Sequence, residues 1–381
     1  MKFKLEIFLM ITFTTVLFSG LSKEKYHEVR PIADFEETQA ILLSSLTFDD
    51  SSDIRPVVKA IIEAGAYVIV LFDEIMSKSE LDIWKKERKI DSDVGKKIFA
   101  ININHDNRWI KDFSPIYVES RNYKGKLEVK FLDYVYRNSS YLSDVLPYQL
   151  GITFEKSVEH VPLSHDIGNF LTNGKDCFVA FTEVNVEYYN QTYQEDLTKS
   201  LKIKGGCENV TVFNNAVHEH IDMWAQVLGE KTAIVSEVTP ETIEFASKNK
   251  YKKMSDLLKI QSQLNTAADM MGQTMDVYRI PHPVRDLNIF RTFTNGIIVN
   301  KTILVPRYLK HSVSDIPYFD EALTESYEKQ VQEVYESLGF AVKFFEVDSW
   351  IAEGGGLHCI SSNIPKRLNI IAERVRGTTE N

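Results

Sequence analysis

Four short segments carry residue types that enzymes use to attack a carbon atom and to move protons. Cys359 is one of three cysteines and follows three glycines in EGGGLHCISSNIPK, residues 353–366. His220 and Asp222 stand in HEHIDMW, and Asp112 stands in HDNRWIKDFSP. A cysteine with a histidine supplies a nucleophile and a proton carrier. The combination predicts thiol chemistry, although each segment alone also fits a structural turn or a buried thiol.

The two aspartates narrow the class of substrate. Carboxylates beside a cysteine raise the pKa of its thiol, so they are poor neighbours for a nucleophile unless the substrate is a cation. A guanidinium presents paired N–H donors that two carboxylates can bind in bidentate fashion. We therefore expect Asp112 and Asp222 to bind a planar cation beside Cys359.

The segment around His220 also has other interpretations. His218, His220 and Asp222 alternate in sequence, so on a strand they would project from one face. That spacing suits a catalytic cluster, a metal site or a solvent-exposed strand edge. No H-E-x-x-H motif or second cysteine cluster completes a zinc ligand set, so we expect no metal. No G-x-G-x-x-G or P-loop motif occurs either, so we expect no nucleotide cofactor.

The elements that must position these residues alternate between helix and strand along the chain. Residues 53–65 predict a helix ended by glycine, and the run AYVIVLFDE that follows predicts a strand. Thr239 and Pro240 form an N-cap signal for another helix. A third helix is expected before Gly339, with Leu323, Tyr327, Val331, Val334, Tyr335 and Leu338 on one face.

Four segments combine two apolar runs with a polar turn and so predict hairpins. They are PIYVESRNYKGKLEVKFLDY, NFLTNGKDCFVAFTEV, DMWAQVLGEKTAIVSEV and TNGIIVNKTILVP. Hairpins with interspersed helices indicate an α/β fold with a repeated β-β-α-type unit. The polar segments stand at the hairpin starts, so equivalent positions of the units would bring them to a central pocket.

Composition describes a soluble globular chain without a nucleic-acid partner. Of 381 residues, 44% are hydrophobic and 26% charged, and the formal net charge is −10. An acidic chain lacks the basic face that phosphates require. No low-complexity run or Pro/Gly-rich linker divides the chain after its N-terminal segment. We therefore expect residues 23–381 to form a single catalytic domain.

The N-terminal residues have the organisation of a secretory signal peptide. Lys2 and Lys4 precede an apolar run at residues 7–18, and small residues follow up to Ser22. Twelve helical residues span about 18 Å, less than the roughly 30 Å of a bilayer core. We expect residues 1–22 to be cleaved and the protein to be secreted, without stable membrane association. An uncleaved anchor is the alternative.

The other two cysteines fit an exported protein. In an oxidising compartment Cys177 and Cys207 could pair, which would leave Cys359 as the odd thiol. Three unrelated buried thiols are the alternative.

With these residues in view, the chain resembles the agmatine deiminase and bacterial-type peptidyl-arginine deiminase family of the guanidino-group-modifying superfamily. RWIKDFSP resembles the family motif W-x-R-D-x-G-P, and HEHIDMW resembles G-H-[IV]-D. FTNGIIV matches a segment whose asparagine lies in the active site of such enzymes. GGGLHCISSNIP is close to G-G-G-I-H-C-I-T-x-x-I-P. The motifs extend from about residue 105 to residue 366.

The resemblance implies a five-bladed pseudo-symmetric α/β propeller, the pentein fold, built of ββαβ-type units and without a cofactor. It implies hydrolysis of a guanidinium to a ureido group and ammonia through a covalent thiouronium intermediate. Cys359 would be the nucleophile and His220 the proton carrier, while Asp112 and Asp222 would hold the guanidinium. It also implies substrate contacts from Trp109, Asp166, Asn295, Arg137, Gly355 and Gly356, with Arg137 facing a substrate carboxylate.

Departures from the family motifs affect the prediction of the substrate more than the prediction of the reaction. Lys111 and Ser114 replace an arginine and a glycine, and Asp166 and Ile167 replace a glutamate and a glycine of agmatine deiminases. Because SHDIGNFLTNG is nearer to the peptidyl enzymes and the chain is expected to be exported, we favour peptidyl or free arginine, converted to citrulline. The main alternative is agmatine, converted to N-carbamoylputrescine for putrescine biosynthesis.

More distant alternatives keep the motifs but change the chemistry. An amidinotransferase or dihydrolase would differ in what resolves the intermediate. A papain-like thiol hydrolase would use Cys359, His220 and Asn295, but it would not need paired aspartates. A binding protein on an inactive deiminase scaffold is the remaining alternative.

Overall fold

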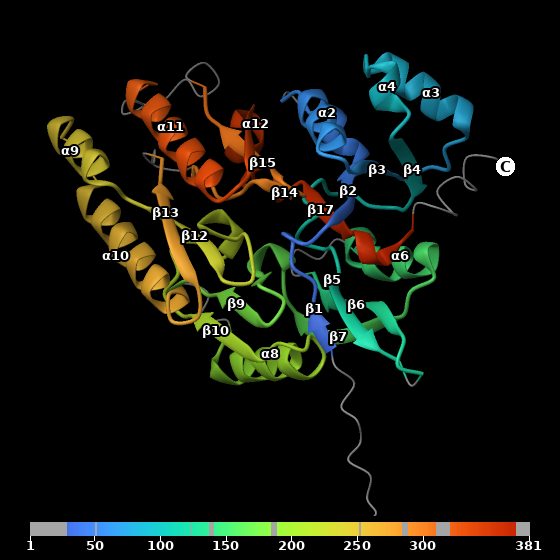
Figure 1. The fold of residues 1–381 in the computed structure, drawn as a ribbon, viewed down its shortest axis with the longest axis horizontal. Coiled ribbons are helices and arrows are strands. Elements are labelled where there is room, and N and C mark those ends of the chain that lie inside the picture. The colour runs from blue at the N-terminus through green and yellow to red at the C-terminus, as the bar shows by residue number, and fades with distance from the viewer. Residues whose placement is uncertain are drawn as a thin grey trace, which may run out of the picture.

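In the part of the chain that the structure describes, the strands form five small sheets, which helices surround (Figure 1). The computed structural model describes residues 29–49, 52–122, 124–136, 141–183, 189–250, 253–283, 289–309 and 321–370. The predicted signal peptide lies outside the described residues. No helix in the described part of the chain has the length and apolar character needed to cross a membrane.

Each of the four predicted hairpins is present as an antiparallel strand pair. The pairs are β5 (Ile116–Arg121) with β6 (Leu127–Val135), β8 (Leu171–Thr172) with β9 (Asp176–Ala180), β11 (Ala225–Val227) with β12 (Thr232–Glu237), and β14 (Ile297–Val299) with β15 (Thr302–Arg307). The polar turns that separate the apolar runs account for this agreement.

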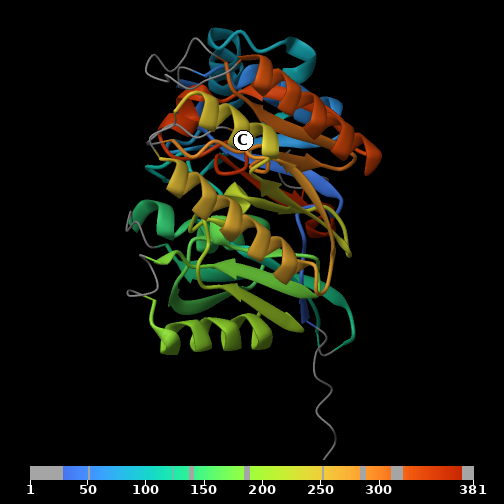
Figure 2. The ribbon, with the colours of Figure 1, turned by 90° about the vertical axis from the view of Figure 1, so that its left-hand side faces the viewer.

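A parallel strand completes each of these sheets after a helical crossover, as parallel pairing requires. The added strands are β7 (Val158–Ser164), β10 (Asn209–Phe213), β13 (Asp276–Pro281) and β16 (Ala341–Glu346). Their crossovers contain α5 (Tyr141–Asp144) and α6 (Leu146–Phe154), α8 (Gln191–Ile203), α9 (Pro240–Lys248) and α10 (Met254–Met271), and α11 (Glu321–Ser337). Figure 2 shows α8 at one end of the molecule and α11 near the other.

The fifth sheet joins the two ends of the described chain. Its antiparallel pair consists of β17 (Ser361–Pro365) and β2 (Thr38–Ser44), which are far apart in sequence. Parallel strands β3 (Tyr67–Phe72) and β4 (Ile98–Asn102) extend it, after α2 (Arg55–Glu63) and then α3 (Lys78–Glu87) and α4 (Ser92–Gly95). A short β1 (Val29–Pro31) pairs with β5. The mixed α/β class is therefore confirmed, with an antiparallel strand pair and an added parallel strand in each of the five sheets.

The central strands of the fifth sheet are buried on both faces. Ile41 and Leu43 of β2 contribute to one hydrophobic cluster, while Ala40 and Leu42 contribute to a second on the other face. The side chains of β3 also alternate between these two clusters. Such continuous apolar runs are typical of parallel strands covered on both sides.

The helix boundaries follow the expected local signals. Gly65 has φ +93° after α2, and Gly339 has φ +85° after α11, a conformation that glycine adopts without steric cost. The Thr239 side chain accepts a hydrogen bond from the backbone N–H of Thr242 and caps α9. On α11, Tyr327 and Val331 are buried against the core, as predicted for the apolar face.

The predicted pairing of Cys177 and Cys207 is confirmed as a disulfide. Cys177 lies in β9, and Cys207 lies between α8 and β10 of the same sheet. Both residues are buried, so the bond crosses the interior of one structural unit. Cys359 is the remaining free cysteine and is also buried.

We predict that the double substitution Cys177→Ala/Cys207→Ala lowers the free energy of unfolding by about 3 kcal/mol, because the bond constrains a closed loop of the unfolded chain. Urea denaturation measures the change, and Cys359→Ser is the matched control because that cysteine forms no cross-link. An unchanged free energy of unfolding in the double variant would contradict the prediction.

Candidate active site

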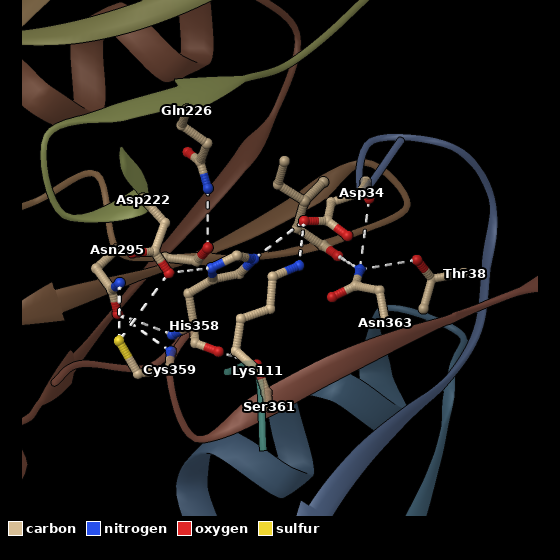
Figure 3. Close-up of polar contacts among 12 residues, drawn as sticks. Asp34, Thr38, Lys111, Asp222, Gln226, Asn295, His358, Cys359, Ser361 and Asn363 are labelled. Carbon is tan, nitrogen blue, oxygen red and sulfur yellow. Dashed lines mark hydrogen bonds and ion pairs between the residues drawn. The ribbon is translucent and has the colours of Figure 1, made fainter. Parts of the chain in front are cut away.

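Cys359 lies in the turn between α12 (Asp348–Ala352) and β17, with only 3% of its surface exposed. Asn295, from the start of the β14–β15 hairpin, fixes this turn (Figure 3). Its Nδ2 donates to the Cys359 Sγ over 3.2 Å, and its Oδ1 accepts from the backbone N–H of His358 over 3.0 Å. One amide therefore orients both the thiol and the backbone before it.

His220 lies between two carboxylates. Its Nδ1 is 3.5 Å from Oδ1 of Asp112, and its Nε2 is 3.6 Å from Oδ2 of Asp166. Burial opposes protonation, but Asp112 and hydrogen bonds with Asp166 and Cys359 outweigh it and raise the pKa of His220 well above its ordinary range. His220 is therefore a cation that can donate a proton. Burial, helped by the charge on His220, lowers the pKa of His218 to about 4.

The expected strand through His218, His220 and Asp222 is wrong. Residues 217–220 form a bend, and Asp222 belongs to the short 3-10 helix η3 (Ile221–Met223). Alternation of polar residues suggested a strand, but burial of Ile221 and Met223 in the tight turn determines the local conformation. The bend directs His220 towards Asp112 and Asp166, while Asp222 approaches Cys359 with its Oδ2 4.0 Å from Sγ.

Asp112 and Asp222 each bury a carboxylate oxygen that has no hydrogen-bond partner, the Oδ1 in both cases. Burial raises the pKa of Asp112 to about 7; His220 opposes this effect, whereas Asp166 and Asp222 add to it. Buried polar atoms without partners are rare in folded proteins. The N–H donors of a guanidinium are the kind of group that these oxygens accept.

The thiol of Cys359 is not activated in this structure. Burial, with the charge on Asp222, raises the pKa of Cys359 to about 11, although a hydrogen bond from His220 acts in the opposite direction. A cation bound between Asp112 and Asp222 would favour the thiolate, because an opposite charge nearby stabilises the ionised form.

Three glycines make room for these side chains. A Cβ on Gly355 would lie 2.5 Å from the Trp109 ring and 2.9 Å from the Cβ of Cys359, and one on Gly356 would lie 2.7 Å from Oδ1 of Asn295. A Cβ on Gly168, which the sequence analysis did not select, would lie 2.6 Å from Oδ1 of Asp112. Close packing of the site therefore requires glycine at these positions.

The structure thus brings most of the predicted residues together. Cys359, His220, Asp222, Asp112, Asp166, Asn295, Trp109, Gly355 and Gly356 are all linked by the contacts above. Arg137 lies outside the described residues. The catalytic and substrate-binding roles of all these residues stay predictions. In the described part of the chain, no group of three histidine, cysteine, aspartate or glutamate side chains is arranged to hold a metal ion.

Sequence reasoning missed three residues behind the site. His358 donates to Asp222 and contacts Asp34, which in turn binds Lys111 (Figure 3). The adjacency of His358 to Cys359 was a usable signal. Asp34 carried none, because it stands before β2 and far in sequence from every other site residue.

Comparison with known proteins agrees with this arrangement. The model of the Porphyromonas-type peptidyl-arginine deiminase family matches residues 32–365. The chain belongs to this family. The resemblance stated from the motifs is therefore confirmed, and members of the peptidyl-arginine deiminase family are hydrolases that act on guanidino C–N bonds. No curated protein sequence matches the chain significantly.

Solved structures show that the chain shares its fold with agmatine deiminases. The agmatine deiminase of C. jejuni has a TM-score of 0.61 at 18% identity, covering 88% of this chain and 96% of its own. Its substrate-bound form has a TM-score of 0.62 at 16% identity, with the same coverage. The agmatine deiminase of Enterococcus faecalis has a TM-score of 0.64 at 14% identity, covering 89% of this chain and 96% of its own.

We predict that Gly168→Ala lowers deiminase activity at least about tenfold, because the added methyl group displaces Asp112 and a misplacement near 1 Å is enough to cost that much. Gly229→Ala is the matched control, since its nearest neighbour would lie 3.5 Å away. The measurement is kcat/KM, with thermal unfolding to verify the fold. Equal activities of the two variants would contradict the assignment of Asp112.

We also predict that iodoacetamide alkylates Cys359 slowly at neutral pH. The rate should still be rising above about pH 8.5, where an ordinary cysteine is half ionised, because a raised pKa moves thiolate formation to higher pH. Mass spectrometry follows a single modification, since the other two cysteines are in the disulfide. A rate that levels off below that pH would contradict the raised pKa.

Proposed function

We propose that this protein is a secreted cysteine-dependent deiminase that converts the guanidinium of peptidyl or free arginine to a ureido group, giving citrulline and ammonia. One observation carries the proposal: two buried carboxylate oxygens without hydrogen-bond partners lie close to a buried thiol and a histidine cation. A guanidinium is a planar cation with enough N–H donors to satisfy both carboxylates.

The first half-reaction breaks a C–N bond. Asp112 and Asp222 accept guanidinium N–H groups and hold its carbon against Cys359, which is catalysis by positioning. The Cys359 thiolate attacks that carbon and forms a C–S bond, giving a tetrahedral adduct. His220 then donates its proton to one nitrogen, the C–N bond breaks, and ammonia leaves. The product is a covalent S-alkylthiouronium.

The second half-reaction uses water. His220, now neutral, takes a proton from a water molecule whose oxygen attacks the thiouronium carbon. The C–S bond breaks and the thiolate of Cys359 returns. The oxygen that remains on the substrate loses its second proton to solvent, where the released ammonia takes it up as ammonium, and the product is a ureido group. His220 is again protonated, so the cycle is complete.

Peptidyl or free arginine is favoured over agmatine by the family model, whose description names peptidyl arginine. The predicted signal peptide agrees with this choice, and a buried disulfide is typical of an oxidising compartment. The agmatine deiminase folds among the solved structures support the alternative, agmatine converted to N-carbamoylputrescine in putrescine biosynthesis.

The five sheets support a proposal about architecture as well. Each contains an antiparallel strand pair and a parallel strand, so we propose that they are the blades of a five-bladed α/β propeller of the pentein type. The site residues then converge because each precedes or begins the innermost strand of a blade.

The proposal is tested by detecting ureido product with agmatine, free arginine and an arginine-terminated peptide side by side. We expect product from an arginine substrate, none from Cys359→Ser, and at least a tenfold lower kcat/KM for Asp112→Asn, because a guanidinium loses one charge partner. Product from agmatine alone would support the alternative. Peptide-bond cleavage without ureido product would instead indicate a papain-like thiol hydrolase.

A further inference from the structure

A chain of alternating charges lies behind the thiol, and of its four members only Asp222 takes part in the reaction steps above. The Nζ of Lys111 is 2.8 Å from Oδ2 of Asp34, and the same oxygen is 3.1 Å from Nε2 of His358. The Nδ1 of His358 is 2.7 Å from Oδ2 of Asp222. Figure 3 shows the four side chains as one connected series that ends beside Cys359.

Both ring nitrogens of His358 face carboxylate oxygens. A neutral imidazole has one donor and one acceptor, so only the imidazolium can donate to Asp34 and Asp222 together. Burial and the nearby Lys111 oppose this charge, but the two carboxylates outweigh them and raise the pKa of His358. His358 is therefore a cation held between two anions.

The position of His358 is fixed from its backbone as well. Its N–H donates to Oδ1 of Asn295, the residue whose Nδ2 donates to the thiol of Cys359. Only 6% of its side chain is exposed, as is 8% of the Lys111 side chain. Because both ring nitrogens are bound and the backbone N–H is fixed, the ring cannot turn without breaking a buried charged contact.

The two oxygens of the Asp222 carboxylate are in different environments. Oδ2 is bound by His358, while Oδ1 is buried without a hydrogen-bond partner. Because His358 is fixed and binds Oδ2, it restricts rotation of the Asp222 carboxylate, so Oδ1 points in one direction. The free oxygen is the one available to a substrate N–H group.

We propose that Lys111, Asp34 and His358 are positioning residues that fix the Asp222 carboxylate in the orientation that binds a guanidinium. Lys111 acts through Asp34, and Asp34 acts through His358. The inference rests on the proposed function, in which Asp222 receives the guanidinium. It adds that the selectivity of Cys359 for a cationic reactant depends on residues that never touch this reactant.

The test compares alkylation of Cys359 by chloroacetamidine and by chloroacetamide. In both reactions the thiolate attacks the CH2 carbon, a C–S bond forms and chloride leaves, but only the amidine carries the planar cation. The measured quantity is the ratio of the two second-order rate constants, relative to the same ratio for free cysteine. The wild type should prefer the amidine, and this readout requires no knowledge of the natural substrate.

We expect His358→Asn and Lys111→Met each to lower this preference about tenfold or more, because each leaves a buried charge of the series unpaired. Lys111→Arg should retain most of it, since a guanidinium also pairs with Asp34. Lys85→Met is the matched control: this lysine is also mostly buried, with 15% of its side chain exposed, but its acidic neighbour is Asp82 on α3.

The double variant Asp34→Asn/Lys111→Met covers the case in which a single variant fails to fold. It removes both charges together, so no ion remains unpaired at that end, and it should fold yet lose the preference. Folded variants that keep the wild-type preference would overturn the positioning role alone. A wild type without any preference for the amidine would contradict the proposed function, and the inference with it.

Discussion

The balance of buried charge around Cys359 is the constraint on which the rest of the site depends. Four aspartates, Asp34, Asp112, Asp166 and Asp222, lie within contact of three cations, His220, His358 and Lys111. A buried charge is costly unless it is paired. The site therefore has one negative charge more than its own side chains neutralise, and the neighbouring carboxylates add to the effect of burial, which raises the pKa of Asp112. A cationic reactant removes this imbalance.

The fold makes such a concentration of charge possible because each residue comes from a different segment. Asp112, Asp166, His220 and Asn295 precede or begin separate hairpins, so short rigid connections hold them. The pairing of β2 with β17 brings Asp34 and His358 together from opposite ends of the chain. Repulsion among the carboxylates is resisted by the buried strands behind them rather than by any local sequence.

Local signals in the sequence were enough to predict the hairpins and the capped helices, and the motifs identified most of the residues that lie together around Cys359. Thr239 and Gly339 act on their immediate neighbours, so a sequence reveals their effect. The bend at His218 was missed because burial of Ile221 overrides the alternation of polar residues. Asp34 was missed because its partners are distant in sequence, and the tight packing at Gly168 is visible only once Asp112 is placed. Contacts between segments that are distant along the chain produce no periodic pattern in the sequence.

The pairing of β2 with β17 also determines when, during synthesis of the chain, the site can form. A ribosome releases β2 early and β17 only after every other strand of the described chain. Until residues 361–365 join β2, the turn that holds Cys359 has no fixed place beside Asn295 and Asp222. A chain that lacks β17 therefore carries the acidic residues without Cys359 in an ordered place beside them. The proposed reaction with a guanidinium can begin only after β17 has paired with β2.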